Sequence, residues 1–271
     1  MSAAARKIRR AKFFAAHPRC CYCNGERLSE EIDHAPARIC FRNKEGPEDF
    51  EFPSCGLCNR AVATSEQVAA FYIRMMDPHG TYLEPDEVHQ IISGVCNNSP
   101  SSLPILNDQA MARLRGDIGD DVPEVDFERV VTIPRAVQDQ LELFGTKMLY
   151  AMFYRASGEF AGPRHRRMMY WAQAGTPLAE QHSRRAEQWF GELRNSERKN
   201  VDIGHQFRYR HGYNRAHGYL GLWMAFGDST VFFGVLGPAK ELATLKMPIS
   251  RYLPIRELGL SVNRAHARKG N

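Results

Sequence analysis

Cys20-Cys21-Tyr22-Cys23 and Cys55-Gly56-Leu57-Cys58 are two close cysteine pairs separated by 31 residues. In each pair the spacing lets one tight turn present both thiols to the same ion, and two such pairs are typical of a tetrahedral zinc site. The segment between the pairs is short and polar, so it needs the metal to hold its shape. We therefore expect Cys20, Cys23, Cys55 and Cys58 to bind a structural Zn²⁺ ion.

The other three of the seven cysteines have less definite roles. Cys21 and Cys40 lie within the motif and are candidate substitute ligands, whereas a lone thiol such as Cys96 usually packs as a small apolar residue. An odd cysteine count, with no apolar secretory segment after the basic start of the chain, indicates metal and free thiols instead of disulfides. These features predict a reducing, cytoplasmic compartment. No apolar run approaches the ~20 residues that a membrane helix needs.

Three side chains inside the cysteine frame have the chemistry of a catalytic site. The ordinary pKa of His34 lies near neutrality, so its imidazole can take a proton from an attacking water. Asp33 and Asn59 offer oxygen atoms to a hard divalent ion such as Mg²⁺ or Mn²⁺. The guanidinium groups of three residues close in sequence could bind phosphate oxygens, namely Arg38, Arg42 and Arg60. The alternative is that Asp33 and His34 only form hydrogen bonds within the zinc loop.

The motif Asp33-His34-x-Pro36, with the two cysteine pairs and Asn59, resembles the HNH endonucleases over residues 15–76. The resemblance implies a treble-clef ββα-metal core, with His34 as general base and with Asp33 and Asn59 as ligands of the catalytic ion. The stretch Glu51-Phe52-Pro53-x-Cys55-x-x-Cys58-Asn59, followed by Glu66-Gln67, is also similar to a bacterial HNH-like group. Where the family has its middle Asn, this chain has Asp49-Phe50-Glu51 and no Asn.

Charge is distributed unevenly along the 271 residues, whose net charge is +5. Residues 61–145 carry 14 acidic and 5 basic side chains, whereas residues 146–217 carry 13 basic and 6 acidic ones. The two outer segments, 1–60 and 218–271, are also net positive. Basic blocks on both sides of an acidic one suit a polyanion that contacts both ends of the chain. Charged, solvated faces without any partner would give the same composition.

A second basic segment, Gly162-Pro163-Arg164-His165-Arg166-Arg167, precedes the apolar run Met168-Met169-Tyr170-Trp171. Basic and aromatic residues together suit phosphate contact and base stacking. Arg164, Arg166 and Arg167 are therefore candidate nucleic-acid contacts. The commoner outcome for such a pattern is a solvated loop that leads into a core helix.

The periodicities predict an α+β chain in three parts. Residues 1–76 would form the zinc-bound core, residues 77–134 an acidic connector of small helices and loops, and residues 135–271 an α+β domain with an antiparallel sheet, for substrate binding or oligomerisation. The expected helices cover 6–17, 59–76, 136–157 and 184–198. The expected strands cover 205–213, 218–226 and 229–237, with Gly227-Asp228 turning between the last two.

The sequence thus predicts a metal-dependent endonuclease that hydrolyses phosphodiester bonds of nucleic acid. DNA is preferred over RNA on the resemblance alone, and a homodimer or a protein partner stays open. The alternative is a non-catalytic zinc-binding module, an adaptor or phage-related effector that binds nucleic acid or a protein. No G-x-x-x-x-G-K-[ST] loop is present, so the sequence gives no sign of energy coupling through nucleotide hydrolysis.

Overall fold

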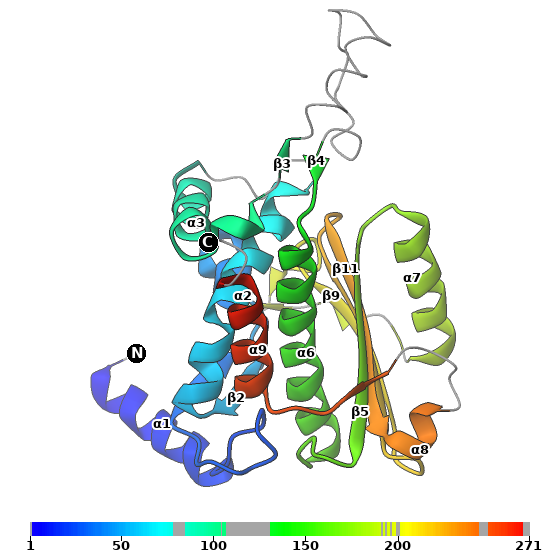
Figure 1. Cartoon of the computed structure of the whole chain (residues 1–271). Helices are drawn as coiled ribbons and strands as arrows, with labels where there is room; N and C mark the ends of the chain where they lie inside the picture. Colours follow the sequence, from blue (N-terminus) through cyan, green and yellow to red (C-terminus); the bar gives the residue numbers. More distant parts are fainter. Residues whose placement is uncertain are drawn as a thin grey trace, which may run out of the picture.

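The computed structural model describes residues 2–77, 85–103, 105–106, 131–190, 192, 194–195, 197–198, 201–243 and 249–267. Within these residues the architecture is mixed α+β with an antiparallel sheet, as the sequence predicts (Figure 1). Most of the connector expected at 77–134 lies outside the described residues.

The N-terminal part is a helix, a hairpin and a second helix. Helix α1 (Ala3–Ala16) begins where the Ser2 hydroxyl accepts a hydrogen bond from the Ala5 amide at 3.2 Å, and it ends before Pro18, which disfavours helical geometry in the preceding residue. Strands β1 (Glu31–His34) and β2 (Glu51–Ser54) pair antiparallel and are followed by α2 (Gly56–Met75). This order agrees with the expected hairpin and helix, while the treble-clef assignment itself stays a prediction. Two short 3-10 turns, η1 (Arg38–Cys40) and η2 (Arg42–Lys44), occupy the loop between the strands.

The larger sheet has six antiparallel strands among the described residues. Their order across the sheet is β12 (Ser250–Arg251), β5 (His165–Gln173), β11 (Thr230–Pro238), β10 (Tyr219–Phe226), β9 (Arg208–Asn214) and β6 (Arg194–Asn195). The last three predicted strands are confirmed as β9, β10 and β11. Gly227, with a φ of 53°, makes the tight turn between β10 and β11.

Helices cover both faces of this sheet, so its central strands are buried on both sides. Helix α6 (Arg135–Ser157) packs on one face, and α7 (Pro177–Trp189) and the short α8 (Ala239–Leu242) pack on the other (Figure 1). In β10, Leu222 and Met224 face the α6 side, while Trp223 and Ala225 face the α7 side. Eight of the nine residues of β11 are buried, and only Pro238 is half-buried. This burial explains the near-continuous apolar sequence of the strand.

The N-terminal segment and the sheet share one hydrophobic core. The cluster on the α6 side contains Cys20, Phe52 and Val62 together with Leu222 and Phe232. The C-terminal helix α9 (Ile255–Ala267) packs on α2 (Figure 1). Helix α3 (Pro85–Asn98) also packs beside α2 and is followed by the turn η3 (Pro100–Ser102). Two minor two-stranded sheets pair β3 (Ile105–Leu106) antiparallel with β4 (Val131–Thr132), and β7 (Glu197–Arg198) antiparallel with β8 (Val201–Asp202).

Three expectations are corrected by the structure. Residues 165–173 form strand β5 and not a loop leading into a core helix, because both sides of this run are covered once it pairs with β11. The helix expected at 184–198 is α7, which begins at Pro177 after the cap of Thr176 and ends at Trp189. Cys96 is exposed on α3 and is not a buried apolar residue.

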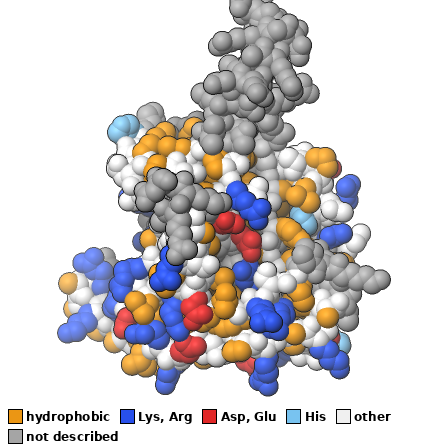
Figure 2. Space-filling view, in the orientation of Figure 1, with side chains coloured by type: hydrophobic (Ala, Val, Ile, Leu, Met, Phe, Trp, Pro, Cys, Tyr) orange, Lys and Arg blue, Asp and Glu red, His pale blue; other side chains and the backbone are white. Residues whose placement is uncertain are grey.

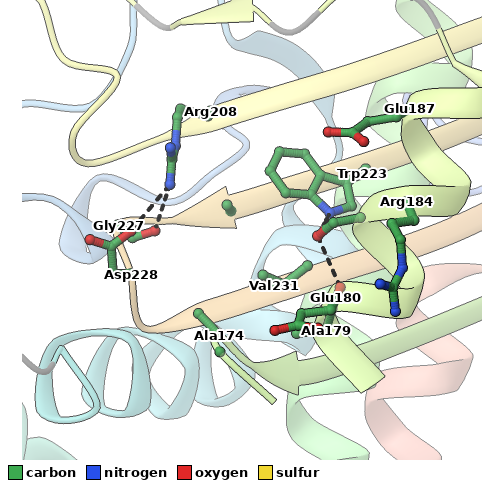
Figure 3. Close-up of a pocket in the computed structure, with 13 residues that line it drawn as sticks. Ala174, Ala179, Glu180, Arg184, Glu187, Arg208, Trp223, Gly227, Asp228 and Val231 are labelled. Carbon is green, nitrogen blue, oxygen red and sulfur yellow. Dashed lines mark hydrogen bonds and ion pairs between the residues drawn. The ribbon is translucent and has the colours of Figure 1, made fainter. Parts of the chain in front are cut away.

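The two glycines Gly212 and Gly221 leave a notch on the sheet, and Phe190, which directly follows helix α7, packs into this notch. A Cβ built on Gly221 would lie 1.7 Å from the Phe190 ring, and one on Gly212 would lie 3.3 Å from the Phe190 Cα atom. The Trp223 indole N–H also donates a hydrogen bond to the Ser183 hydroxyl of α7 at 3.1 Å. Beyond the notch, Arg208 points to the β10–β11 turn and donates to the Gly227 carbonyl and the Asp228 carboxylate, beside an open hollow of mixed charge (Figure 3).

We predict that Gly221→Ala lowers the free energy of unfolding by about 1–3 kcal/mol, because the added methyl group overpacks the site of Phe190. Urea unfolding of the single variants and of Gly221→Ala/Phe190→Ala would measure the coupling between the two positions. The double variant should lose less stability than the sum of the single losses, and strict additivity would contradict this account of the notch.

Candidate metal centre and nucleic-acid surface

The four predicted zinc ligands come together. One sulfur from each of Cys20, Cys23, Cys55 and Cys58 lies within 4.8 Å of the others, and all four residues are buried. The first pair is held by a turn in which Asn24 and Gly25 have φ values of 55° and 68°. The second pair lies at the start of α2, with Cys55 as the N-cap and Cys58 in the first turn. This cluster could hold a structural metal such as zinc.

The protonation chemistry of the cluster fits a cation. Hydrogen bonds from Cys20 and Cys58 lower the pKa of Cys23 to about 2, while the hydrogen bond with Cys23 raises the pKa of Cys20 to about 12. The pKa of Cys58 is raised well above its ordinary value by its hydrogen bonds with Cys20 and Cys23 and by burial. Four sulfurs so close together cannot all ionise alone, whereas a bound divalent ion stabilises four thiolates.

The two substitute ligands considered above are buried but lie outside the four-sulfur group. Burial raises the pKa of both the Cys21 and the Cys40 thiols well above the ordinary value, so both remain protonated. Their surroundings are those of packed, inert thiols.

Replacing one sulfur ligand should release the metal. We predict that Cys55→Ser reduces bound zinc from roughly one ion per chain to near zero and lowers the free energy of unfolding by at least about 4 kcal/mol, because the core depends on the metal for its shape. The matched control is Cys96→Ser, which changes an exposed thiol. Metal analysis and thermal unfolding test this, and an unchanged zinc content in Cys55→Ser would refute the metal centre.

Asp33 lies in a buried ion pair and does not face an open site. Its carboxylate accepts a hydrogen bond from the Tyr22 hydroxyl at 2.5 Å and one from the Lys147 ammonium at 2.8 Å. The same ammonium pairs with Glu66. Burial alone would lower the pKa of Lys147, but Asp33 and Glu66 raise it above its ordinary value, so the ammonium stays charged. The expectation that Asp33 reaches a solvent-open metal ion is therefore not met, because only 6% of the residue is exposed.

Asn59 is likewise engaged by another partner. Its side-chain amide donates to the Glu31 carboxylate, and Glu30 accepts a hydrogen bond from the Gly56 amide at 3.0 Å. Two neighbouring acids thus serve the start of α2, where the helix dipole favours negative charge. Through this hydrogen bond to Glu31, Asn59 attaches helix α2 to strand β1 of the hairpin.

His34 lies on the other face of β1, since successive residues of a strand point to opposite sides. It pairs across the hairpin with Glu51, and its Nε2 atom lies 3.9 Å from Glu51 Oε1. Of the three residues at the family's middle motif position, Glu51 is therefore the one that faces His34. Burial, and then the charge of Arg38, lower the pKa of His34, so the imidazole is neutral at pH 7. The described geometry therefore does not bring His34, Asp33 and Asn59 around one open site.

Basic side chains gather around the exposed face of this hairpin. Helix α1 carries five cations and no acid, and each of its residues is exposed or half-buried. Its Arg9 pairs with Glu51, beside His34, and Figure 2 shows Lys and Arg side chains clustered over α1 at the lower left. The predicted phosphate contacts Arg38, Arg42 and Arg60 are exposed. The cations of α1 were missed as candidate contacts, although the acid-free basic run was the signal that could have shown them.

The second predicted basic segment is only partly available. Arg164 is exposed, and half-buried Arg166 donates to the carbonyls of Pro163 and His165. Arg167 is buried and paired with Glu142 at 2.8 Å, with Thr146 as a further acceptor. Its assignment as a nucleic-acid contact is corrected, because a phosphate could reach it only by breaking this pair.

No protein-family model, curated protein or solved structure matches the chain. In the part of the chain that the structure describes, no helix is long and apolar enough to span a membrane.

Lys147 should be the most sensitive position of the buried ion pair. We predict that Lys147→Met lowers the free energy of unfolding by about 3–5 kcal/mol, because it leaves a buried carboxylate without its partner. Adding Asp33→Asn should recover part of the loss. Urea unfolding is the measurement, with Lys12→Met on exposed α1 as the matched control, for which we expect a change within about 0.5 kcal/mol. A Lys147→Met protein as stable as the control would contradict the pairing.

Proposed function

We propose that the chain is a zinc-ordered nucleic-acid-binding module whose HNH-like, treble-clef core does not catalyse. The observation that carries the proposal is the division of the β1–β2 hairpin into two faces. Asp33, which a catalytic ion would need, is buried against Lys147, while the opposite face carries His34 and Glu51 beside the basic helix α1. The buried face serves to stabilise the fold, and the face beside the basic helix α1 can bind a polyanion.

Several features support nucleic acid as the partner. Five cations without an acid lie along one exposed helix, and Arg38 lies close enough to lower the pKa of His34. The contact between Arg9 and Glu51 has 52% of the arginine side chain exposed, so it contributes little to stability and can yield to a phosphate. Phosphate contacts of this kind position a protein on nucleic acid without reading its sequence. DNA remains the preferred partner by resemblance.

Removing charge from α1 should weaken binding and its dependence on salt. For Arg6→Gln/Arg10→Gln/Lys12→Gln, we expect weaker DNA binding and a salt dependence shallower by about one unit of slope for each lost phosphate contact. Gln keeps the helix propensity close to that of the original residues. Fluorescence anisotropy with a labelled duplex at several salt concentrations is the measurement.

The matched control removes the same charge from three exposed arginines on other elements, Arg184→Gln/Arg251→Gln/Arg264→Gln. Equal loss of affinity in both triple variants would show a response to net charge alone and would count against α1 as the contact surface.

A metal-dependent endonuclease is the second candidate, favoured by one observation. His34 is neutral at pH 7, has 26% of its side chain exposed and lies close enough to Arg38 and Arg9 for their charges to lower its pKa, which suits a general base beside a phosphate. A divalent ion, Mg²⁺ or Mn²⁺, would have to displace Lys147 from Asp33.

Plasmid nicking with Mg²⁺ and Mn²⁺ separates the two candidates. We expect the zinc-loaded wild type to leave supercoiled plasmid intact while binding it. Metal-dependent nicking by the wild type that disappears in His34→Ala, with zinc retained, would establish the nuclease and reject the non-catalytic proposal.

A further inference from the structure

A pocket lined by aromatic rings lies on the α7 side of the large sheet, away from the zinc core. Its volume is about 380 Å³, within the usual range for small-ligand sites. Trp189 and Phe190 from the end of α7, Tyr219 from β10 and His217 from the preceding turn supply four rings. Glu241 of α8 completes the polar rim.

Packing explains why a large ring is left facing solvent here. Phe190 fills the notch at Gly221 and is 7% exposed, whereas the preceding Trp189 keeps 48% of its surface exposed. Among the residues that the structure describes, it is one of few large apolar side chains with so much exposed surface. An exposed indole at the mouth of an aromatic pocket is a stacking surface for a planar ring.

The turn before β10 holds the rest of the pocket in place. The Asn214 side-chain oxygen accepts hydrogen bonds from the amides of Ala216 and His217 at 3.1 and 3.2 Å. The Asn214 amide also donates to the Tyr219 hydroxyl at 3.4 Å. One side chain therefore fixes the backbone of the turn at His217 and also contacts the Tyr219 hydroxyl.

The charges around the rim of the pocket distinguish between two kinds of ligand, an organic cation and a planar ring that carries a phosphate. His217 Nδ1 lies 3.0 Å from Glu241, so the carboxylate already has a partner. Two exposed cations lie near them in the sequence: Arg215 is two residues before His217, and Lys240 directly precedes Glu241. An organic cation in the aromatic pocket would meet this excess of basic groups, whereas a ring that carries a phosphate would be favoured by it.

We propose that this pocket binds a nucleobase, stacked on Trp189 and Tyr219, with its phosphate at the rim near Arg215 and Lys240. The base could belong to single-stranded nucleic acid or to a free nucleotide. The single-strand form rests on the proposed function, while the free-nucleotide form does not.

The test compares the full-length, zinc-loaded wild type with Trp189→Ala and the matched variant Trp189→Phe. Anisotropy would measure binding of a labelled 12-nucleotide single strand and of the duplex of the same sequence, and tryptophan fluorescence would follow titration with adenosine monophosphate. We expect Trp189→Ala to weaken single-strand binding about 5- to 140-fold, as loss of one stacked base does, and to leave duplex binding unchanged. Trp189→Phe should keep most of the affinity.

The outcomes separate the two ligand sources and the two proposals. Saturable quenching by adenosine monophosphate in the wild type but not in Trp189→Ala supports a free nucleotide, and a strand effect without quenching supports the single strand. Equal binding of strand and nucleotide by the wild type and Trp189→Ala overturns the pocket inference, and intact duplex binding would then leave the proposed function standing. The pocket inference is also overturned if tetramethylammonium quenches the tryptophan fluorescence and adenosine monophosphate does not. Quenching by the nucleotide in a protein that binds no nucleic acid supports the pocket inference and rejects the proposed function.

Discussion

The ammonium group of Lys147 connects three parts of the chain that are far apart in sequence. It comes from the middle of α6, and it meets Asp33 of the hairpin and Glu66 of α2. Burying a cation is costly, and here the cost is offset by two carboxylates and a hydrogen bond from Tyr22 to Asp33. Since Tyr22 lies between Cys20 and Cys23 of the sulfur cluster, the same contact joins this cluster to α6 and thus to the sheet that α6 covers.

In this arrangement Asp33 and Asn59, two of the three residues predicted to form a catalytic site, stabilise the fold. The acid of the Asp33-His34 pair anchors the hairpin to the body of the protein, and the amide of Asn59 anchors α2 to the hairpin. What remains on the exposed side is a neutral imidazole, a glutamate and a set of arginines next to a basic helix. Such a surface can hold phosphates by charge, whereas hydrolysis would also need an ion bound by oxygen ligands close to the base. The aromatic pocket is a separate feature on the α7 side of the sheet and offers a stacking surface.

Local patterns predicted the parts of the fold that depend on local chemistry. The cysteine spacing predicted the sulfur cluster, the apolar periodicity predicted α6, and Gly227-Asp228 predicted the β10–β11 hairpin. Strand β5 was missed because a continuous apolar run has no period that separates strand from helix, and its partner β11 lies more than fifty residues away in the chain. The start of α7 was signalled by Thr176-Pro177, a cap followed by proline, and was overlooked. The pairing of Asp33 with Lys147 spans 114 residues, and nothing in either local sequence indicates it.

The most direct test of this account is whether Asp33 binds a divalent ion or Lys147. Electron paramagnetic resonance of Mn²⁺ added to the zinc-loaded protein would measure this without any assumption about substrate. We expect no tightly bound Mn²⁺ that depends on Asp33, since its carboxylate is already paired with Lys147. A single Mn²⁺ ion held with micromolar affinity by the wild type, and lost in Asp33→Asn while zinc and fold are retained, would contradict it.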